Sequence, residues 1–367
     1  MKSVKAVVVL AGCLICLAMQ AFAQEDDSTV SEIEQRKQIS QQAAELLRTD
    51  NFAELEKTAE GLRTNKSRLP SGLWKLRYFY EGIGTPANGA TGNEWVTHLA
   101  RLEKWRVQYP ESITVHTALA AAYVNYAWQA RGGGNADTVT PEGWELFRER
   151  IHKAEEYVAA GRKLPTTDPQ LDCEELVIGG KGLDWNREQY NAAFDDAVKR
   201  EPQYEPLYFQ KEEYLLPRWS GKRGDVERFA LEVARLTQRT DGKAMYARLA
   251  GHLRQYLDKD TWFFDEYRFS WPDVRAGFRD LEERYPHSLW NLNAFCWMAC
   301  HAKDRKTAHE LFARIGDRWD GDIWGNEGAY RTWKKWAENR TASSTGSGEN
   351  AEEVPLWRRL LRDLLSW

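Results

Sequence analysis

The sequence predicts an all-α fold built from stacked helical hairpins. The first observation is a recurring frame, in which a large apolar residue is flanked at helical spacing and a helix-stopping residue follows. Tyr190, Phe194 and Ala197 show this frame, and Pro202 ends it. Residues at these spacings share one face of a helix, and proline ends a helix because it lacks an N–H and clashes with the preceding turn. Pro206 then suits the first turn of a second helix.

The second observation is that such stops recur along the chain. They fall at positions 110, 165, 202, 241, 286 and 320. A period of about 34 residues is typical of tetratricopeptide helix pairs, and we expect the longer gaps to hold loop insertions at 132–141 and 262–271. The frame positions of the other repeats are His98, Leu102 and Trp105; Lys153, Tyr157 and Ala160; Phe229, Val233 and Leu236; Val274, Phe278 and Leu281; and Ala308, Phe312 and Ile315. One hairpin cannot bury its apolar face alone, so we expect a tetratricopeptide-like α-solenoid with a concave surface.

The segment before the repeats is also expected to be helical. Its elements are helices at 30–63, 74–80, 94–109 and 113–129, with a Gly- and Pro-rich loop at 82–92. Phe52, Leu55, Ala59 and Leu62 give the first of these an apolar face. The glycine-rich insertion at 131–135 has no GxxxxGK[ST] pattern and no strand before it, which argues against a phosphate cradle.

The first 23 residues have the pattern of a secretory signal peptide. Lys2 and Lys5 precede an apolar run at 6–19, and Ala21-Phe22-Ala23 is a small-residue cleavage pattern. A competing interpretation is a lipoprotein signal, since Leu10-Ala11-Gly12-Cys13 resembles the motif that leads to lipidation of Cys13. We therefore expect a periplasmic or secreted bacterial protein, with residues 24–337 as the helical-repeat domain.

The end of the chain differs in composition from the repeats. Residues 338–353 are rich in Gly, Ser and acidic residues and are expected to be a flexible linker. Residues 354–367 are expected to form an amphipathic helix that caps the solenoid, inserts in a partner's groove or lies on a membrane surface. Its apolar interaction face contains Trp357, Leu360, Leu361, Leu364 and Trp367.

Charge and cysteine content exclude several classes of protein. The chain has 367 residues, a formal net charge of −4 and no basic block, which argues against a nucleic-acid partner. After removal of the signal peptide three cysteines remain. One disulfide between Cys173 and either Cys296 or Cys300 is compatible with an oxidising compartment, but buried free thiols are the favoured interpretation because free cysteine is among the most buried residue types.

Motifs for chemistry are weak, so we expect no metal and no cofactor. Cys296, Cys300 and His301 miss the CxxCH spacing of c-type haem attachment by one residue. The seven histidines show no zinc-site spacing. The acidic pairs at 195–196, 212–213 and 282–283 each point about 100° apart on a helix, which is typical of solvated faces rather than of a glycosidase cleft.

The chain is rich in aromatic residues, with 17 Trp, 15 Tyr and 13 Phe. Aromatic side chains supply binding area at low entropic cost, although most are expected to fill gaps between hairpins. We predict an exported, non-enzymatic scaffold that binds a protein or peptide in the cell envelope; the alternatives are a carbohydrate-active hydrolase and an aromatic-lined glycan-binding module. By analogy with other solenoids, the partner-binding residues on the concave face are expected to be Tyr123, Tyr126, Gln210, Tyr214, Tyr246, Asn291 and Asn293.

Two stretches carry a family resemblance. The run YLLPRWSG at 214–221 and the longer run at 284–319 resemble a bacterial, usually secreted domain-of-unknown-function family of the DUF4034 type. The resemblance covers residues 165–336. It implies helices of tetratricopeptide type and export, and it brings no activity and no catalytic residues.

Overall fold

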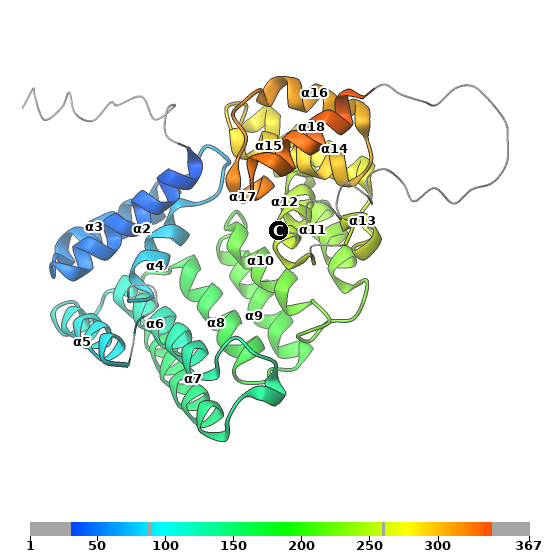
Figure 1. Ribbon diagram of the computed structural model, residues 1–367. Helices are drawn as coiled ribbons and strands as arrows, with labels where there is room; N and C mark the ends of the chain where they lie inside the picture. Colours follow the sequence, from blue (N-terminus) through cyan, green and yellow to red (C-terminus); the bar gives the residue numbers. More distant parts are fainter. Residues whose placement is uncertain (1–30, 87–89, 91, 259–260, 340–367) are drawn as a thin grey trace, which may run out of the picture.

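The structure is a computed structural model that describes residues 31–86, 90, 92–258 and 261–339 (Figure 1). Within these ranges the regular secondary structure is helical, apart from one isolated antiparallel bridge between Arg68 and Trp74. The all-α prediction is therefore confirmed. The predicted signal peptide and the predicted C-terminal helix at 354–367 lie outside the described residues. In the described parts of the chain, no helix combines the length and the apolar character that crossing a bilayer requires.

The first half of the chain contains helices from α2 to α10. These are α2 (Glu32–Arg48), α3 (Phe52–Thr64), α4 (Lys75–Ile83), α5 (Gly92–Gln108), α6 (Ile113–Arg131), α7 (Pro141–Gly161), α8 (Pro169–Lys181), α9 (Arg187–Arg200) and α10 (Glu205–Tyr214). A short 3-10 turn, Ala136–Thr138, lies between α6 and α7.

The second half contains helices from α11 to α18. These are α11 (Asp225–Asp241), α12 (Ala244–Leu253), α13 (Phe263–Glu266), α14 (Trp271–Arg284), α15 (Leu289–His301), α16 (Arg305–Ile315), α17 (Gly321–Trp324) and α18 (Glu327–Glu338). A 3-10 turn, Arg254–Tyr256, continues directly from α12.

Local sequence accounts for many of these helix starts. At α9 the Asn186 side chain accepts from the Gln189 N–H while the Gln189 side chain accepts from the Asn186 N–H, a complete capping box. Serine caps α2, α6, α14 and α15 in the simpler one-way form. Proline occupies the first turn of α7, α8, α10 and α14, where its missing N–H costs nothing.

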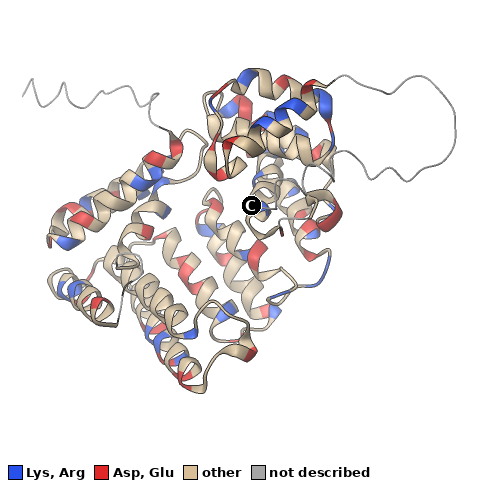
Figure 2. Ribbon diagram, in the orientation of Figure 1, with Lys and Arg blue, Asp and Glu red and all other residues tan. Residues whose placement is uncertain are grey.

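Helices that are close in the sequence pack against each other. α6 packs on α7, α8 on α9 and α10, α12 on α14, and α15 on α16. Figure 1 shows the result as an arc that runs from the blue α2–α3 pair through the green helices to the orange α15–α18 group. Acidic and basic side chains are interspersed along this arc rather than gathered in one single-sign region (Figure 2).

The predicted frame matches the buried faces of most of the helices that carry it. Tyr190, Phe194 and Ala197 are all buried, and the frame residues of α5, α14 and α16 are buried as well. Two positions are wrong: Leu236 on α11 is 68% exposed, and Lys153 on α7 is exposed. The buried face of α7 instead contains Ile151, Ala154 and Val158. The predicted frame begins at a lysine, and the apolar residues that follow it do not by themselves determine which face of the helix is buried.

Other sequence-based boundaries also need correction. The predicted helix at 30–63 is two helices, broken where Asp50 adopts a left-handed conformation (φ 54°) and Asn51 caps α3. The predicted insertion at 262–271 holds the short helix α13. The predicted linker at 338–353 begins one residue too early, because α18 continues to Glu338.

The arc is closed by the segment between α3 and α4. We call residues 68–74 the clasp, because they connect the first helices with helices near the other end of the chain. The Ser71 carbonyl accepts hydrogen bonds from Arg248 Nη2 on α12 (2.6 Å) and from Asn291 Nδ2 on α15 (3.1 Å). Ser71 also donates from its N–H to Glu32 Oε2 (2.8 Å) and from its hydroxyl to Glu32 Oε1 (2.6 Å).

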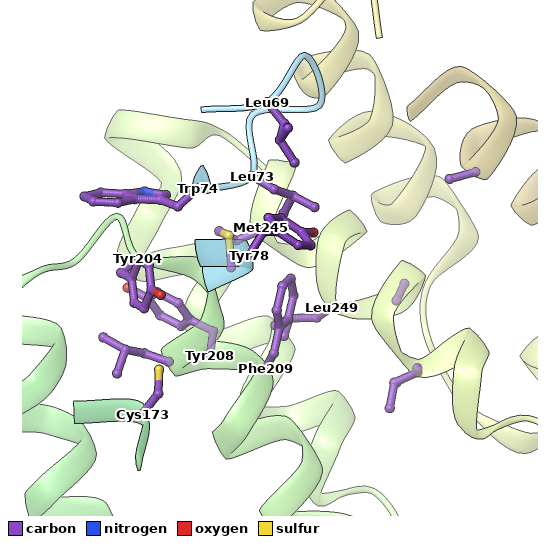
Figure 3. Close-up of a cluster of buried hydrophobic side chains, with 14 of the residues drawn as sticks. Leu69, Leu73, Trp74, Tyr78, Cys173, Tyr204, Tyr208, Phe209, Met245 and Leu249 are labelled. Carbon is purple, nitrogen blue, oxygen red and sulfur yellow. The ribbon is translucent and has the colours of Figure 1, made fainter. Parts of the chain in front are cut away.

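Apolar packing supports the clasp on its inner side. Figure 3 shows Leu69, Leu73 and Trp74 together with aromatic residues of α10 and with Met245 and Leu249 of α12. The Trp74 ring meets the Tyr204 ring edge-on at 5.2 Å between centroids. The start and the later part of the chain therefore share one hydrophobic core.

Candidate ligand-binding cavity

A cavity of about 550 Å³ lies where the closed arc brings its two parts together. One side comes from α2 and α4, and the other from α10, α12, α14 and α15, with Gln255 of the 3-10 turn after α12 and Asp322 of α17. Because the clasp holds these helices side by side, the cavity depends on the closure of the arc. Volumes of about 300–1,000 Å³ are typical of small-molecule and cofactor sites.

Aromatic side chains form much of the apolar wall. Tyr78 on α4, Phe209 on α10, Phe278 on α14 and Trp290 on α15 all line the cavity. Arg36 extends across this wall, with its guanidinium carbon 5.3 Å from the centroid of the Tyr78 ring and 4.9 Å from that of the Trp290 ring. The wall thus offers both apolar area and cation–π contacts.

The polar lining is predominantly positive. Its cations outnumber its carboxylates; the cationic residues are Arg36, Lys37, Arg77, Arg248 and Arg254, and the acidic ones are Glu81 and Asp322. Two of the cations are paired with a carboxylate on their own helix, Arg36 with Glu32 and Arg77 with Glu81 at 2.7 Å.

Three buried polar atoms of the lining residues have no hydrogen-bond partner among the described residues. They are Arg36 Nε, Trp290 Nε1 and Asn291 Oδ1. Asn291 is only 4% exposed, so bulk water does not readily satisfy its oxygen. A buried polar atom without a partner costs about 1–3 kcal/mol, so this side of the cavity is held at some cost to stability.

A buried acid–base pair lies behind one side of the cavity. His252 lines the cavity, stacks on Phe209 at 4.3 Å between ring centroids, and its Nδ1 lies 2.7 Å from Glu212 Oε2. Burial lowers the pKa of His252 to about 3, and the nearby positive charges of Arg77 and Lys181 lower it further. Burial raises the pKa of Glu212 well above its ordinary value, with the neighbouring Glu213 as a second cause. Burial therefore favours the neutral form of both members of the pair.

Two further cavities differ in their lining. One of about 590 Å³ lies on the other side of Trp290 and Asn291, which line both cavities. Another of about 410 Å³, between α3, α8 and α9, is strongly polar. In the latter Asp172 already pairs with Arg162 and, at 2.7 Å, with Arg200, so its central charge is satisfied within the protein.

Of the predicted partner-binding residues, Asn291 lines the central cavity. Three others lie in the interior: Tyr214, stacked on Tyr190 at 3.7 Å; Tyr246, whose hydroxyl accepts from the Ser270 N–H; and Asn293, which accepts from Trp324 Nε1. Side chains in such packed positions hold helices together rather than face a partner.

The remaining three predicted residues lie outside the central cavity's lining. Tyr123 stacks on Tyr157 at 5.6 Å and Tyr126 on Trp95 at 4.8 Å, so both fill gaps between helices. Gln210 on α10 is half-buried. The structure thus does not bring the seven residues together on one surface.

The three cysteines of the described residues lie in the core, and His301 is enclosed beside aromatic rings. Cys173, Cys296 and Cys300 are free and buried, which confirms the favoured interpretation over a disulfide. His301 stacks on Trp297 at 3.6 Å, and its Nδ1 accepts from the Phe263 N–H, which leaves the ring enclosed by aromatic side chains. Within the described residues, no cluster of three or more His, Cys, Asp or Glu side chains could hold a metal ion.

Sequence reasoning missed most of the cavity. Arg248, Gly251, His252 and Gln255 recur at helical spacing within the apolar segment that follows Ala244. A polar stripe on an otherwise apolar helix is the signal that could have pointed to an enclosed polar site. Lys37 and Trp290 carried no comparable signal.

The comparisons with known proteins do not place the chain in a family. No family model matches it, and neither a curated protein nor a solved structure is significantly similar to it. The resemblance of residues 165–336 to a secreted family of unknown function therefore stays a prediction.

Proposed function

We propose that the chain is a tetratricopeptide-like helical scaffold, without an activity of its own, that binds a peptide segment of a protein partner in the central cavity. The sequential packing of helical pairs supports the tetratricopeptide-like part of the proposal. The cavity carries the binding part, because it combines aromatic walls with exposed polar lining residues and an excess of cations. Its setting in the cell envelope rests on the signal-peptide pattern of the first 23 residues.

The exposed polar lining residues favour a peptide over an apolar ligand. Lys37 offers a donor, and the amide of Gln41 offers both donors and an acceptor. A peptide group offers a carbonyl oxygen and an N–H together, so one backbone segment supplies both kinds of partner. The aromatic wall of Tyr78 and Phe209 then suits an apolar side chain of the same segment.

Selection from a displayed library of random 12-residue peptides tests the proposal. Peptides that are selected are then titrated by fluorescence anisotropy against the wild type and against Lys37→Glu/Gln41→Glu, which changes two exposed lining residues. We expect the double variant to bind at least about tenfold more weakly. Lys153→Glu on α7, outside the cavity's lining, is the matched control and should bind as the wild type does.

Two results would overturn the proposal. One is that no peptide is selected, and the other is that selected peptides bind the double variant and the wild type equally well. A glycan array run in parallel addresses the alternative of a glycan-binding module. If the protein bound a glycan and no peptide, the aromatic wall would be identified as a sugar-binding surface.

A further inference from the structure

We infer that the peptide bound in the central cavity carries a carboxylate, which is received by Arg248, Arg254 and Lys37. This inference rests on the proposed function and adds to it the chemical character of the ligand. It follows from a difference among the cations of the cavity: Arg36 and Arg77 form ion pairs with carboxylates, and the other three form none with the residues that the structure describes.

Arg248 is a half-buried guanidinium without a close carboxylate. Its Nη2 donates to the backbone carbonyl of Ser71 at 2.6 Å, and its guanidinium carbon lies 5.7 Å from the centroid of the Tyr285 ring. Burial lowers the pKa of Arg248, against the more distant negative charge of Glu205. Glu205 itself is occupied, since it accepts from the Trp74 N–H at 2.5 Å.

Arg254 is in a similar position. Its Nη1 donates to the Ile323 carbonyl at 3.5 Å, and its guanidinium carbon lies 5.9 Å from the centroid of the Trp297 ring. Burial lowers the pKa of Arg254, and Asp322 and Asp320 oppose this only partly. A charge removed from water is costly unless a counter-charge is close, so Arg248 and Arg254 both gain from an anion in the cavity.

Lys37 adds an exposed ammonium to the lining. It lies one residue after Arg36 on α2, and in the described part of the chain it forms no ion pair. The three cations come from α2 and from α12 with the turn that follows it. An anion between them would therefore contact both parts of the closed arc.

A carboxylate fits the neighbouring atoms better than a spherical anion does. Gln41, which is exposed and lines the cavity on the same helix as Lys37, has an amide that can donate and accept. A peptide that places its carboxylate on the cations can place a backbone N–H or carbonyl on Gln41. The carboxylate can belong to an Asp or Glu side chain or to the C-terminus of the peptide, and the experiment separates the two.

The test uses one selected peptide and matched derivatives of it with the full chain. In one derivative each Asp or Glu is replaced by Asn or Gln, and in another the C-terminus is amidated. We expect one of the two to bind the wild type at least about tenfold more weakly, and to show which carboxylate is bound. With Arg254→Gln or Lys37→Gln, the difference between peptide and derivative should shrink, while Lys153→Gln should leave it unchanged.

The outcomes separate the inference from the proposed function. If both neutral derivatives bind the wild type as tightly as the parent peptide, the carboxylate inference is overturned while peptide binding stands. If no peptide binds, the proposed function itself has failed. Lys37→Gln keeps the test decisive should Arg254→Gln fail to fold, because Lys37 is exposed.

Discussion

At the scale of single residues, two buried histidines couple the fold to pH. Burial lowers the pKa of both His252 and His301 to about 3, from an ordinary value of 6.5. Below about pH 6.5 the unfolded chain takes up protons at these positions and the folded chain does not. Their contribution is therefore fully present above pH 6.5 and is lost progressively as the pH falls toward 3. Glu212 acts with the opposite sign, because its pKa is raised in the folded protein: its contribution is fully present below its ordinary value of 4.5 and is lost as the pH rises above that value.

We predict that the free energy of unfolding decreases as the pH is lowered from 6.5 to 5, a range that lies above the pH at which most carboxylates titrate. The double variant His252→Gln/His301→Gln should be less stable at pH 7, since both rings are packed against aromatic groups. Its stability should depend less on pH across this window. Urea unfolding at several pH values measures this, with the exposed His152→Gln as control; equal pH dependence in the double variant and the wild type would contradict the assignment.

The repeat frame makes a second prediction at single positions. Phe194 is 4% exposed and meets the Tyr208 and Phe229 rings edge-on. Phe194→Ala should lower the free energy of unfolding by about 3–5 kcal/mol. Leu236→Ala should change it by less than about 0.5 kcal/mol, because Leu236 is 68% exposed. Denaturant titration distinguishes the two, and equal costs would mean that the register of α9 or α11 is wrong.

At the scale of elements, the clasp is the feature on which the cavity depends. Gly72 has φ +87°, a conformation that side chains rarely adopt, and a Cβ placed on it would lie 2.3 Å from the Tyr285 ring. The ring belongs to the end of α14, so the clasp approaches that helix more closely than any residue with a side chain allows.

We predict that Gly72→Ala weakens or opens the clasp. The left-handed conformation alone costs about 1–2 kcal/mol, and displacement of Tyr285 adds to this. Gly61→Ala on α3 is the matched control, because nothing lies within 4 Å of its added Cβ. A helical Gly→Ala change there should be neutral or stabilising by up to about 1 kcal/mol. Thermal melts compare the two, and a Gly72→Ala protein as stable as the wild type would show that the clasp does not close the arc.

Many helix boundaries and buried faces could be predicted from the sequence, because they depend on residues that are close in the chain. The capping residues, the prolines of first turns and the apolar faces of α9, α14 and α16 all depend on neighbours within a few residues. The clasp could not be predicted, since Ser71 is separated from its partners by 177 and 220 residues. The central cavity is built by this closure, which is why, of the seven residues expected from a generic concave face, only Asn291 lines it. The role of the C-terminal segment at 354–367 stays a prediction.

At the scale of the whole molecule, closure should change how the chain unfolds. A repeat array in which only neighbours touch can lose its end repeats independently. Here the first helices share one core with α10 and α12. We predict a single transition in urea, with coincident midpoints for tryptophan fluorescence and far-UV circular dichroism. Gly72→Ala should separate the two midpoints, and separated midpoints in the wild type would contradict coupling through the clasp.

Ser71 is fastened to α2 through its N–H and hydroxyl and to α15 through its carbonyl, which fixes the spacing between these two helices before any ligand arrives. An open superhelix can stretch or twist along its axis, and a ligand must then select one curvature at an entropic cost. A receptor already held at its working width avoids that cost. Complex formation should consequently proceed without a slow rearrangement of the helices, and the dissociation rate of the ligand should depend on its contacts with the cavity.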